Sequence, residues 1–410
     1  MHAERCPYRA RAWWGDRLVA ESTSALRVEE PGRTPVLCFP NEDVRFDLFC
    51  EEGGEGVWSI DGDGGPPPES WFDEPVTGPV DGTGVLRRLR EPLPLAGLAA
   101  FDHDRVRVEL VDERPGDASR DVTVKRFPTW GDASHLIDML DVRPDGDRRY
   151  ASVTGNDPRR PVVEGSQLLA QAIVAAGRHA PGRRAVSAHM IFLRAADGGQ
   201  PLELDLEELS AGRTFTALSV DVGQGGRRCA RGAVLLDVTA PDTVRHAAPP
   251  PPVAGPYDSQ AYDMSVTGRD VRIVDGAYTD DPEAPVGPPV LDAWVRFRTV
   301  PEDPYLHAGL LVQFTGHLSI AAALRPHTGI GQRQAHRTLS TAINAIGLSL
   351  HADVRADRWM RYHHRSTFAG DGMTHAVCSV TDEAGALLAS FSVDAMVRPF
   401  EGTAGTRTAL

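Results

Sequence analysis

The sequence has a single lysine, no paired cysteines and no long hydrophobic run, and each absence excludes a class of protein. Lys125 is the only lysine, so arginine carries nearly all the positive charge, and the formal net charge is -14. Because affinity for nucleic acid comes largely from clustered lysine and arginine, this charge argues against a nucleic-acid partner. The arginine bias, together with many Ala, Gly and Pro residues, suggests a GC-rich, actinobacterial genome.

The five cysteines are odd in number and contain no Cys-x-x-Cys pair. Neither a disulfide framework nor a zinc site is therefore expected. His363 and His364 are adjacent, and strand alternation points them to opposite faces, so they would not ligate one ion together. We predict no metal and no cofactor.

No hydrophobic run approaches the ~20 residues that cross a bilayer. The N-terminal residues MHAERCPYRARAWW also lack the apolar stretch of a signal peptide. We therefore expect no membrane partner and a cytoplasmic location. With 410 residues, 41% of them hydrophobic, the chain is long enough for two or three globular domains.

Changes of pattern divide the chain into five parts. Residues 1–115 show short strand-like segments between Gly- and Pro-rich turns, which predicts a small all-β domain. Residues 116–130 turn polar and suit a linker. Residues 131–246 contain one helix with an apolar face, in PVVEGSQLLAQAIVAAGRH, followed by strand-like segments. The proline run of 247–257 predicts a stiff connection, and 258–410 repeats the plan of helix and strands.

Two copies of one helix-plus-sheet unit predict an α+β fold of the double hotdog type. In this fold two antiparallel sheets join edge to edge, which removes exposed edges, and each wraps around a long helix. The second of these helices is expected in LHAGLLVQFTGHLSIAAAL, as one strongly apolar segment.

Several segments carry a family resemblance in the expected order and spacing. They are EGSQLLAQAIVAAG, SAHMIFLRAAD, LSAGRTFTALSVDV, AALRPH, LSLHADVRADRWMRY and EAGALLASFSVDAMVR, and they resemble the acyl-CoA thioesterase II family. The resemblance, which runs from about Ser134 to Arg398, implies a double hotdog that acts on acyl-CoA or acyl-carrier thioesters and, by analogy, a homodimer or larger assembly. In the N-terminal domain, WWGDRLVAEST and FPNEDVRFDLF resemble the domain-of-unknown-function 427 family, which implies a fold but no catalytic set.

In the thioesterase family an Asp on the second central helix, a Thr or Ser on a following strand and a Gln near the end of the last strand are thought to position and activate water. The resemblance places His317 at the Asp position and Val393 at the Gln position. Asp394 follows Val393, and strand alternation would point it away from the pocket unless a bulge intervenes. Val393 and Asp394 are both candidates for substrate binding.

The position of the hydroxyl group stays open. Counting forward from His317 reaches Thr341, whereas counting back from Trp359 reaches Ile343. Asn344 and Ser340 could also face the pocket, so Thr341 and Asn344 are both candidate catalytic residues.

Hydrolysis also needs hydrogen-bond donors for the carbonyl oxygen and a group that accepts a proton. The start of the first central helix, around Gly165, Ser166 and Gln167, offers backbone N–H groups at a positive helix end. A neutral His317 suits a general base near pH 7, because the reference pKa of histidine is ~6.5, unless it is a core histidine. Glu164 is a second acid or base if it faces inward, and otherwise a carboxylate favoured by the helix dipole.

Three functions remain open at this point. The first is hydrolysis of an acyl-CoA or carrier-bound thioester with an altered residue set, in which His replaces Asp and Val replaces Gln. The second is a lyase, cyclase or acyltransferase in specialised metabolism, because a base without a fixed water can remove a proton next to a thioester carbonyl. The third is a non-catalytic acyl-binding protein.

Overall fold

The computed structural model forms two compact units. The first comprises residues 1–133 and 261–267, and the second comprises 134–260 and 268–410. The structure describes residues 2–6, 8–29, 35–52, 57–59, 86–88, 95–103, 105–112, 121–127, 134–152, 162–264, 266, 268–278, 285–298, 300–331, 334 and 338–399.

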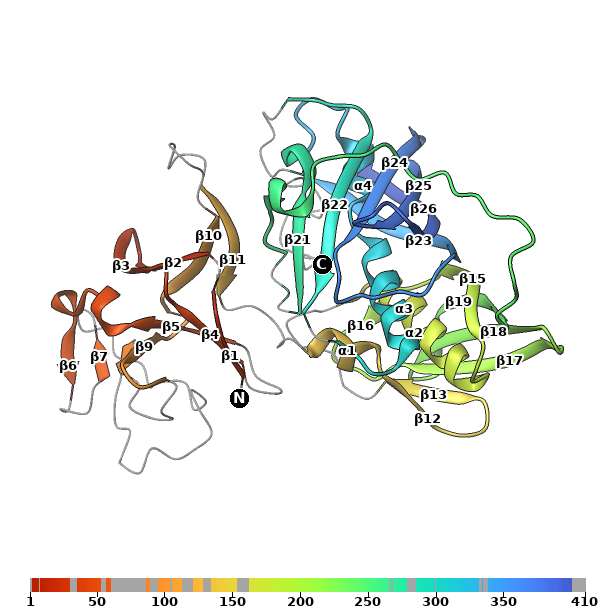
Figure 1. Ribbon diagram of the computed structural model, residues 1–410, viewed down its shortest axis with the longest axis horizontal. Helices are drawn as coiled ribbons and strands as arrows, with labels where there is room; N and C mark the ends of the chain where they lie inside the picture. The colour runs from red at the N-terminus through yellow and green to blue at the C-terminus, as the bar shows by residue number, and fades with distance from the viewer. Residues whose placement is uncertain are drawn as a thin grey trace. The chain divides into compact units, whose positions relative to one another are not determined.

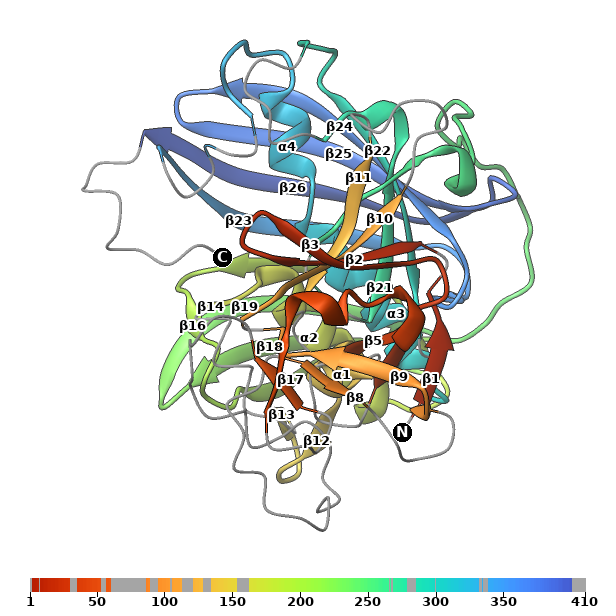
Figure 2. The same ribbon diagram turned by 90° about the vertical axis from the view of Figure 1, so that its left-hand side faces the viewer.

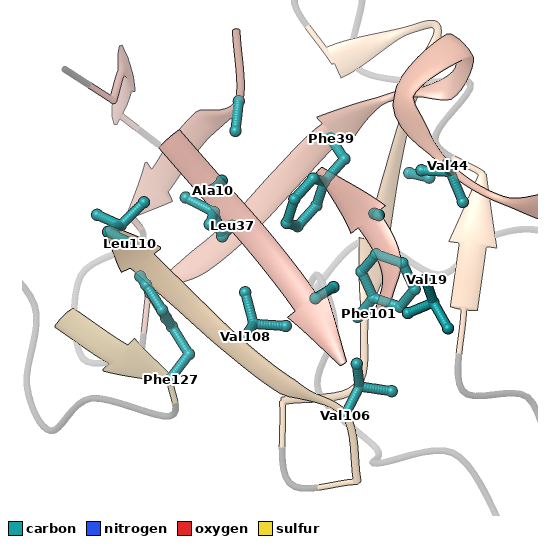
Figure 3. Close-up of a cluster of buried hydrophobic side chains, with 14 of the residues drawn as sticks. Ala10, Val19, Leu37, Phe39, Val44, Phe101, Val106, Val108, Leu110 and Phe127 are labelled. Atoms are coloured by element: carbon teal, nitrogen blue, oxygen red, sulfur yellow. The ribbon is translucent and has the colours of Figure 1, made fainter. Parts of the chain in front are cut away.

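The first unit is the small all-β domain that the sequence predicts. Its strands form two antiparallel sheets, with the orders β1-β4-β5-β9-β8-β7-β6 and β11-β10-β2-β3. The strands are β1 (His2–Arg5), β2 (Arg9–Trp14), β3 (Arg17–Ser22), β4 (Leu26–Glu29), β5 (Val36–Pro40), β6 (Cys50–Glu52), β7 (Val57–Ser59), β8 (Leu86–Arg88), β9 (Leu98–Phe101), β10 (Arg107–Asp112) and β11 (Val122–Phe127), with short 3-10 turns η1 (Asn41–Asp43) and η2 (Phe46–Leu48). Both sheets contribute to one core, where the rings of Phe39 and Phe101 meet edge to face at 5.4 Å (Figure 3).

The predicted linker over 116–130 is wrong in part, because Val122–Phe127 form strand β11. This strand pairs with β10 from Val108↔Phe127 to Asp112↔Val122. Val124 and Phe127 are buried in the core of the first unit. Buried Lys125 and exposed Arg126 lie between them, so the strand lacks the regular alternation of apolar and polar residues that marks a half-buried strand in a sequence.

A second difference concerns residues 261–267, which the sequence assigns to the second hotdog but which fold with the first unit. Ala261 lies in the core of that unit. The single lysine, Lys125, donates from Nζ to the carbonyl of Val266 at 2.9 Å and lies 3.2 Å from Asp263 Oδ1. The segment that leads into the second hotdog is thus anchored on β11.

The second unit contains the double hotdog. One antiparallel sheet has the order β12-β13-β17-β18-β19-β15-β23-β26-β25-β24-β22-β21-β20. Its strands are β12 (Val142–Pro144), β13 (Arg149–Ser152), β15 (Arg184–Phe192), β17 (Glu203–Ala211), β18 (Phe215–Gln224), β19 (Arg227–Asp237), β20 (Gln260–Ala261), β21 (Arg269–Ile273), β22 (Val290–Phe297), β23 (Leu339–Leu350), β24 (Met360–Gly370), β25 (Met373–Asp382) and β26 (Leu387–Pro399); a separate pair is β14 (Val162–Val163) and β16 (Ala196–Asp197).

The two halves of the large sheet join where β15 pairs with β23. The register runs from Ser187↔Ser349 to Ile191↔Ala345. Each half repeats one strand order, β13-β17-β18-β19-β15 in the first and β22-β24-β25-β26-β23 in the second. The predicted double hotdog, with its edge-to-edge join, is therefore confirmed (Figures 1 and 2).

The sheet curves around the central helices. These are α2 (Gly165–His179) in the first half and α3 (Pro304–Gln313) with α4 (Ser319–Leu324) in the second; a short α1 (His135–Leu140) precedes them. Helices α2 and α3 lie side by side and approach closely because glycines face the contact. A Cβ at Gly177 would lie 2.3 Å from the ring of Tyr305, and one at Gly309 would lie 3.0 Å from Val174 Cγ2.

The second central helix is not continuous, contrary to the sequence-based expectation. After α3, a 3-10 turn η7 (Phe314–Gly316) leads to His317 in an extended conformation (φ -97°, ψ 154°) and Leu318 with a left-handed φ of 68°. A Cβ at Gly316 would lie 2.5 Å from Ser166 Oγ on α2. The backbone therefore passes close to α2 at Gly316, where the chain leaves the helical conformation.

Residues 304–324 are long and apolar enough, taken together, to count as a possible membrane span, which the sequence analysis did not anticipate. However, 72% of the most apolar window is buried within the protein. The helix break and the surrounding sheet are typical of a core segment, so this length and composition follow from burial in the hotdog.

Candidate active site

Glu164 immediately precedes α2, with an extended backbone (φ -65°, ψ 140°). Its carbonyl accepts a hydrogen bond from the N–H of Gln167 at 3.0 Å and so closes the first turn of the helix. Its side chain makes no capping hydrogen bond to α2. The carboxylate instead contacts Gln313 and His317 of the second half. It therefore does more than interact with the dipole of α2.

Four polar side chains form a connected ring, which we call the polar quartet: Glu164, Arg269, Gln313 and His317. His317 Nε2 lies 3.5 Å from Glu164 Oε1 and 3.2 Å from one terminal nitrogen of Arg269. The other terminal nitrogen of Arg269 donates to Gln313 Oε1 at 2.9 Å. Gln313 Nε2 donates to Glu164 Oε2, also at 2.9 Å, which closes the ring.

Aromatic stacking fixes two members of the quartet. The imidazole of His317 lies parallel to the ring of Phe314, with centroids 4.6 Å apart and an angle of 4° between the planes. The guanidinium of Arg269 lies 5.0 Å from the centroid of the same ring. Arg269 is only 3% exposed, and a buried cation is costly unless acceptors and π faces compensate it. The quartet and Phe314 supply that compensation.

The start of α2 contributes a hydroxyl beside the quartet. Ser166 is fully buried, and among the described residues its Oγ has no hydrogen-bond partner. It packs against Gly316, directly before His317. Gly165 stands against the ring of Phe192, whose atoms would lie 3.0 Å from an added Cβ, and Gln167 is buried. The candidate oxyanion site therefore lies where α2 meets the break in the second helix.

Two candidate positions from the sequence, on the paired strands β23 and β26, are apolar. Ile343 pairs with Ala395, and its Cδ1 would lie 3.3 Å from a Cβ on Gly316. Val393 is 1% exposed and pairs with Ile346. Ile343, the residue reached by counting back from Trp359, therefore lies beside Gly316. Neither Ile343 nor Val393 offers a side-chain donor or acceptor.

Thr341 and Asn344 have different settings on β23. Thr341 is buried and shares a strand face with Ile343, two residues further from the join. Asn344 lies in a β-bulge, since the pairing of β23 with β26 shifts between Ile343 and Ala345. Its Oδ1 is buried without a partner among the described residues.

The side chain of Asp394 is turned away from that of Val393, and its assignment to substrate binding stays a prediction. Its side chain is 49% exposed and its Oδ1 lies 2.7 Å from His375 Nδ1 on β25. Asp394 faces the bulge in β23, but no bulge interrupts β26 on its β25 side between Val393 and Ala395. The alternation that buries Val393 therefore turns Asp394 to the opposite face.

A second buried cluster lies beyond the helix break. The Oγ of Ser319, the first residue of α4, lies 3.0 Å from His364 Nδ1, and the Sγ of Cys378 lies 3.3 Å from the same nitrogen. Burial lowers the pKa of His364 to about 3 and raises the pKa of Cys378 to about 12. Both groups are therefore neutral at pH 7, which makes this cluster a hydrogen-bonded part of the core.

His363 points to the face of β24 opposite to that of His364, as strand alternation predicts. Its Nδ1 lies 3.0 Å from Asp292 Oδ1, which also accepts from Arg361 Nε at 2.8 Å. Although burial opposes it, the hydrogen bonds from His363 and Arg361 lower the pKa of Asp292. No group of three or more His, Cys, Asp or Glu side chains suited to a metal occurs among the described residues.

Arg269 and Gln313 were missed in the sequence. A signal for Gln313 was present, because a lone amide in the apolar run GLLVQF lies four residues before His317, a spacing that puts both on one helical face. Arg269 gave no such signal. It lies on a short strand distant in sequence from both, and only the tertiary fold brings it to the quartet.

Comparisons with known proteins agree with this architecture. Residues 156–236 match the acyl-CoA thioesterase N-terminal domain and residues 233–396 match the acyl-CoA thioesterase C-terminal domain. The chain is 25% identical to acyl-coenzyme A thioesterase 8 of Mus musculus over 238 residues, which cover 52% of this chain and 73% of that protein. The resemblance of residues 1–115 to a family of unknown function stays a prediction.

Solved structures show the same fold. A tesB protein from Mycobacterium avium subs paratuberculosis has a TM-score of 0.55 and 22% identity, covering 65% of this chain and 100% of its own. An acyl-CoA thioesterase II from Mycobacterium marinum has a TM-score of 0.55 and 23% identity, covering 65% and 99%. With both domain models matched in order over more than half its length, the chain belongs to the acyl-CoA thioesterase family of hydrolases.

Proposed function

We propose that this protein hydrolyses the thioester bond of an acyl group carried by CoA or by a carrier protein, in the cytoplasm and as a homodimer or larger assembly. The thioester carbonyl binds at the start of α2, beside Ser166, and the polar quartet handles the proton. The observation that carries the proposal is the 3.5 Å contact of His317 with Glu164, because it joins the two halves of the matched fold at this helix end.

The chemistry requires one proton to move twice. A water molecule loses a proton to the quartet as its oxygen attacks the carbonyl carbon, and the developing oxyanion accepts hydrogen bonds from the first turn of α2. The C–S bond then breaks, and the proton returns to the sulfur of the leaving thiol. Both products, a carboxylic acid and a free thiol, are accounted for without a cofactor.

A second candidate is a lyase acting on the same thioester, and one observation favours it. The position of Ile343, whose Cδ1 would lie 3.3 Å from a Cβ on Gly316, offers no side-chain donor or acceptor that would hold a water molecule. An acid–base pair beside an apolar wall suits removal of a proton at the carbon next to the carbonyl, with loss of a hydroxyl from the following carbon. Cyclisation or acyl transfer would use the same two side chains, Glu164 and His317. A non-catalytic protein would bind the acyl group without using them for proton transfer.

A panel of acyl-CoAs of graded chain length distinguishes these reactions. Release of free thiol, measured by titration with a disulfide reagent, is expected for hydrolysis. A 3-hydroxyacyl-CoA that loses the mass of one water without thiol release would instead identify a lyase. Thermal stabilisation by acyl-CoA with no turnover would leave only binding. His317→Ala is expected to abolish turnover while the thermal unfolding transition is kept; an unchanged rate would refute the role of the quartet.

A further inference from the structure

We propose that Glu164, and not His317, takes the proton from water, and that Arg269 and Gln313 are positioning residues that hold His317 as a neutral hydrogen-bond donor. This inference rests on the proposed hydrolysis and assigns its roles. It reverses the expectation from the sequence, in which the histidine is the base.

The contact between Arg269 and His317 decides the protonation of the imidazole. An arginine side chain has only donors, and it stays charged in proteins. At 3.2 Å from the guanidinium nitrogen, His317 Nε2 must therefore be the acceptor, which leaves the ring proton on Nδ1. The carboxylate of Glu164, 3.5 Å from the same Nε2, favours a charged ring, whereas the hydrogen bond from Arg269 and its positive charge favour the neutral ring. We give the shorter contact with Arg269 the deciding weight, so that His317 acts as a donor through Nδ1–H.

Gln313 orients the carboxylate in the same way. Its Oε1 accepts from Arg269, so its amide must present Nε2–H to Glu164 Oε2, and the 2.9 Å distance fits this bond. Gln313 is 1% exposed and is held in a single amide orientation by these two contacts. Glu164 Oε2 is thereby fixed, and Oε1 remains on the side of His317 and the start of α2.

No other charged group described near His317 changes this picture. Glu164 comes from the start of α2 and Arg269 from β21. His364, on β24, interacts electrostatically with His317, but its pKa of about 3 keeps it neutral. Tyr362, also on β24, stays protonated because burial raises its pKa well above the usual range. Contacts at 3.5 Å and 3.2 Å place the anion of Glu164 and the cation of Arg269 beside His317.

The proton balance follows directly. Glu164 accepts a proton from water while the water oxygen bonds to the carbonyl carbon, and His317 donates a hydrogen bond to the oxyanion without losing its proton. When the C–S bond breaks, the electron pair leaves on sulfur and Glu164–H protonates it. The carboxylate is regenerated, and no further reactant is needed.

The pH–rate profile of thiol release separates the two assignments. With a carboxylate base, the acidic limb of kcat/KM falls below pH ~5, near the reference value of glutamate; with an imidazole base it falls at pH ~6 to 7. Arg269→Met is expected to add a fall in kcat/KM at pH ~6 to 7, because His317 can then be protonated in that range. Arg269→Lys keeps a charged donor and is expected to keep the lower limb.

Rate constants test each role. Glu164→Gln is expected to lower kcat ~10²- to 10⁴-fold, whereas His317→Gln, which keeps an N–H donor, loses less than His317→Ala. Gln313→Leu is expected to lower kcat ~10-fold or more with little change in KM, as for lost orientation. Glu207→Gln, on the exposed part of β17, is the matched control and is expected to leave both constants unchanged.

A measurement independent of turnover completes the test and remains informative if Arg269→Met does not fold. In wild-type protein with ¹⁵N-labelled histidine, His317 is expected to show the neutral Nδ1–H form from pH 8 to 5. An Nε2–H form, or an imidazolium that appears near pH ~6.5, would overturn the inference. Absence of thiol release from every acyl-CoA, with the expected nitrogen spectrum, would instead overturn the proposed hydrolysis alone.

Discussion

The two hotdog halves follow one strand order but treat their central helices differently. In the first half α2 runs unbroken for 15 residues. In the second half the helix stops at Gln313, turns through η7 and restarts at Ser319. The polar quartet assembles at this break, with Glu164 from the start of the intact helix and two of its other members from the end of the interrupted one.

The polar quartet therefore depends on the asymmetry between the unbroken helix of the first half and the interrupted helix of the second. A continuous second helix would carry side chains past α2 and separate His317 from Glu164. Instead, the absence of a side chain at Gly316 lets the backbone pass Ser166, and the left-handed Leu318 redirects the chain into α4. A non-glycine residue at positive φ costs about 1 kcal/mol or more, which the surrounding core must offset.

The break is tested most directly by Gly316→Ala, for which we expect the largest effect. The new Cβ would lie 2.5 Å from Ser166 Oγ, so α2 and η7 must separate. The free energy of unfolding should fall by about 1 to 3 kcal/mol. Thiol release should fall about 100-fold, because a shift of ~1 Å in a catalytic group costs about that much.

The matched control is Gly199→Ala, in a turn of the first half where the nearest atom to a Cβ lies at 3.5 Å. Its melting temperature and rate should stay close to those of the wild type. Equal behaviour of the two variants would mean that the close approach at Gly316 does not determine the break.

The contact between the two helices gives the next largest effect. In Gly177→Ala the new Cβ would lie 2.3 Å from the ring of Tyr305, whose hydroxyl is held by the carbonyl of Arg183 at 3.0 Å. The ring cannot easily move, so we expect a loss of about 2 kcal/mol in chemical denaturation. In Gly309→Ala the new Cβ would lie 3.0 Å from Val174 Cγ2, with Leu140 Cδ1 at 3.5 Å and the carbonyl oxygen of Ala170 at 3.8 Å. Because these contacts are longer and the residue gains helix propensity, stability should change by less than about 1 kcal/mol. A larger loss at Gly309 would contradict this ranking.

The fold was largely predictable from the sequence, and its exceptions have physical causes. The repeat of apolar helix and alternating strands predicted the joined hotdog sheets, because the buried faces of both elements leave periodic patterns. The break at His317 was not predictable, since Gly316 alone in an apolar run does not end a helix. At the break Gly316 packs against Ser166, a residue about 150 positions away, and a local pattern does not encode this contact.

The candidate site was predictable only in part for the same reason. Glu164 was predicted from its position just before the first central helix. His317 was predicted from the family resemblance of the second central helix. Their proximity, and the presence of Arg269, depend on contacts between elements that local patterns do not encode. Strand alternation already indicated that Asp394 faces away from Val393, and its contact with His375 agrees with that orientation.

The halves should also differ in their response to acid. Buried polar groups of the first half include the amides of Gln167 and Gln171, whereas the second half buries His364 with a pKa of about 3. Because the unfolded chain has a histidine pKa near ~6.5, it binds more protons between these values, and stability falls as the pH drops below ~6.5. At pH 5 the loss should be about 2 kcal/mol.

Hydrogen exchange at pH 7.5 and pH 5 checks this assignment. Amides of β24 should lose more protection at pH 5 than those of β18, and His364→Asn should remove most of the difference. Equal loss in both halves, or an unchanged difference in the variant, would show that another group controls the acid response.

The smallest effect is expected at Asp394, which distinguishes the two faces of one strand. Asp394 pairs with His375, and their side chains are 49% and 37% exposed, respectively. Exposed pairs of this kind contribute at most about 1 kcal/mol to stability. Asp394→Asn should therefore shift stability by less than about 0.5 kcal/mol and leave kcat and KM within about two-fold. Val393→Asn, one residue away and 1% exposed, should instead lose about 1 to 3 kcal/mol by burying an unpaired amide. A larger loss of activity in Asp394→Asn than in Val393→Asn would mean that the substrate binds on the outer face of the sheet.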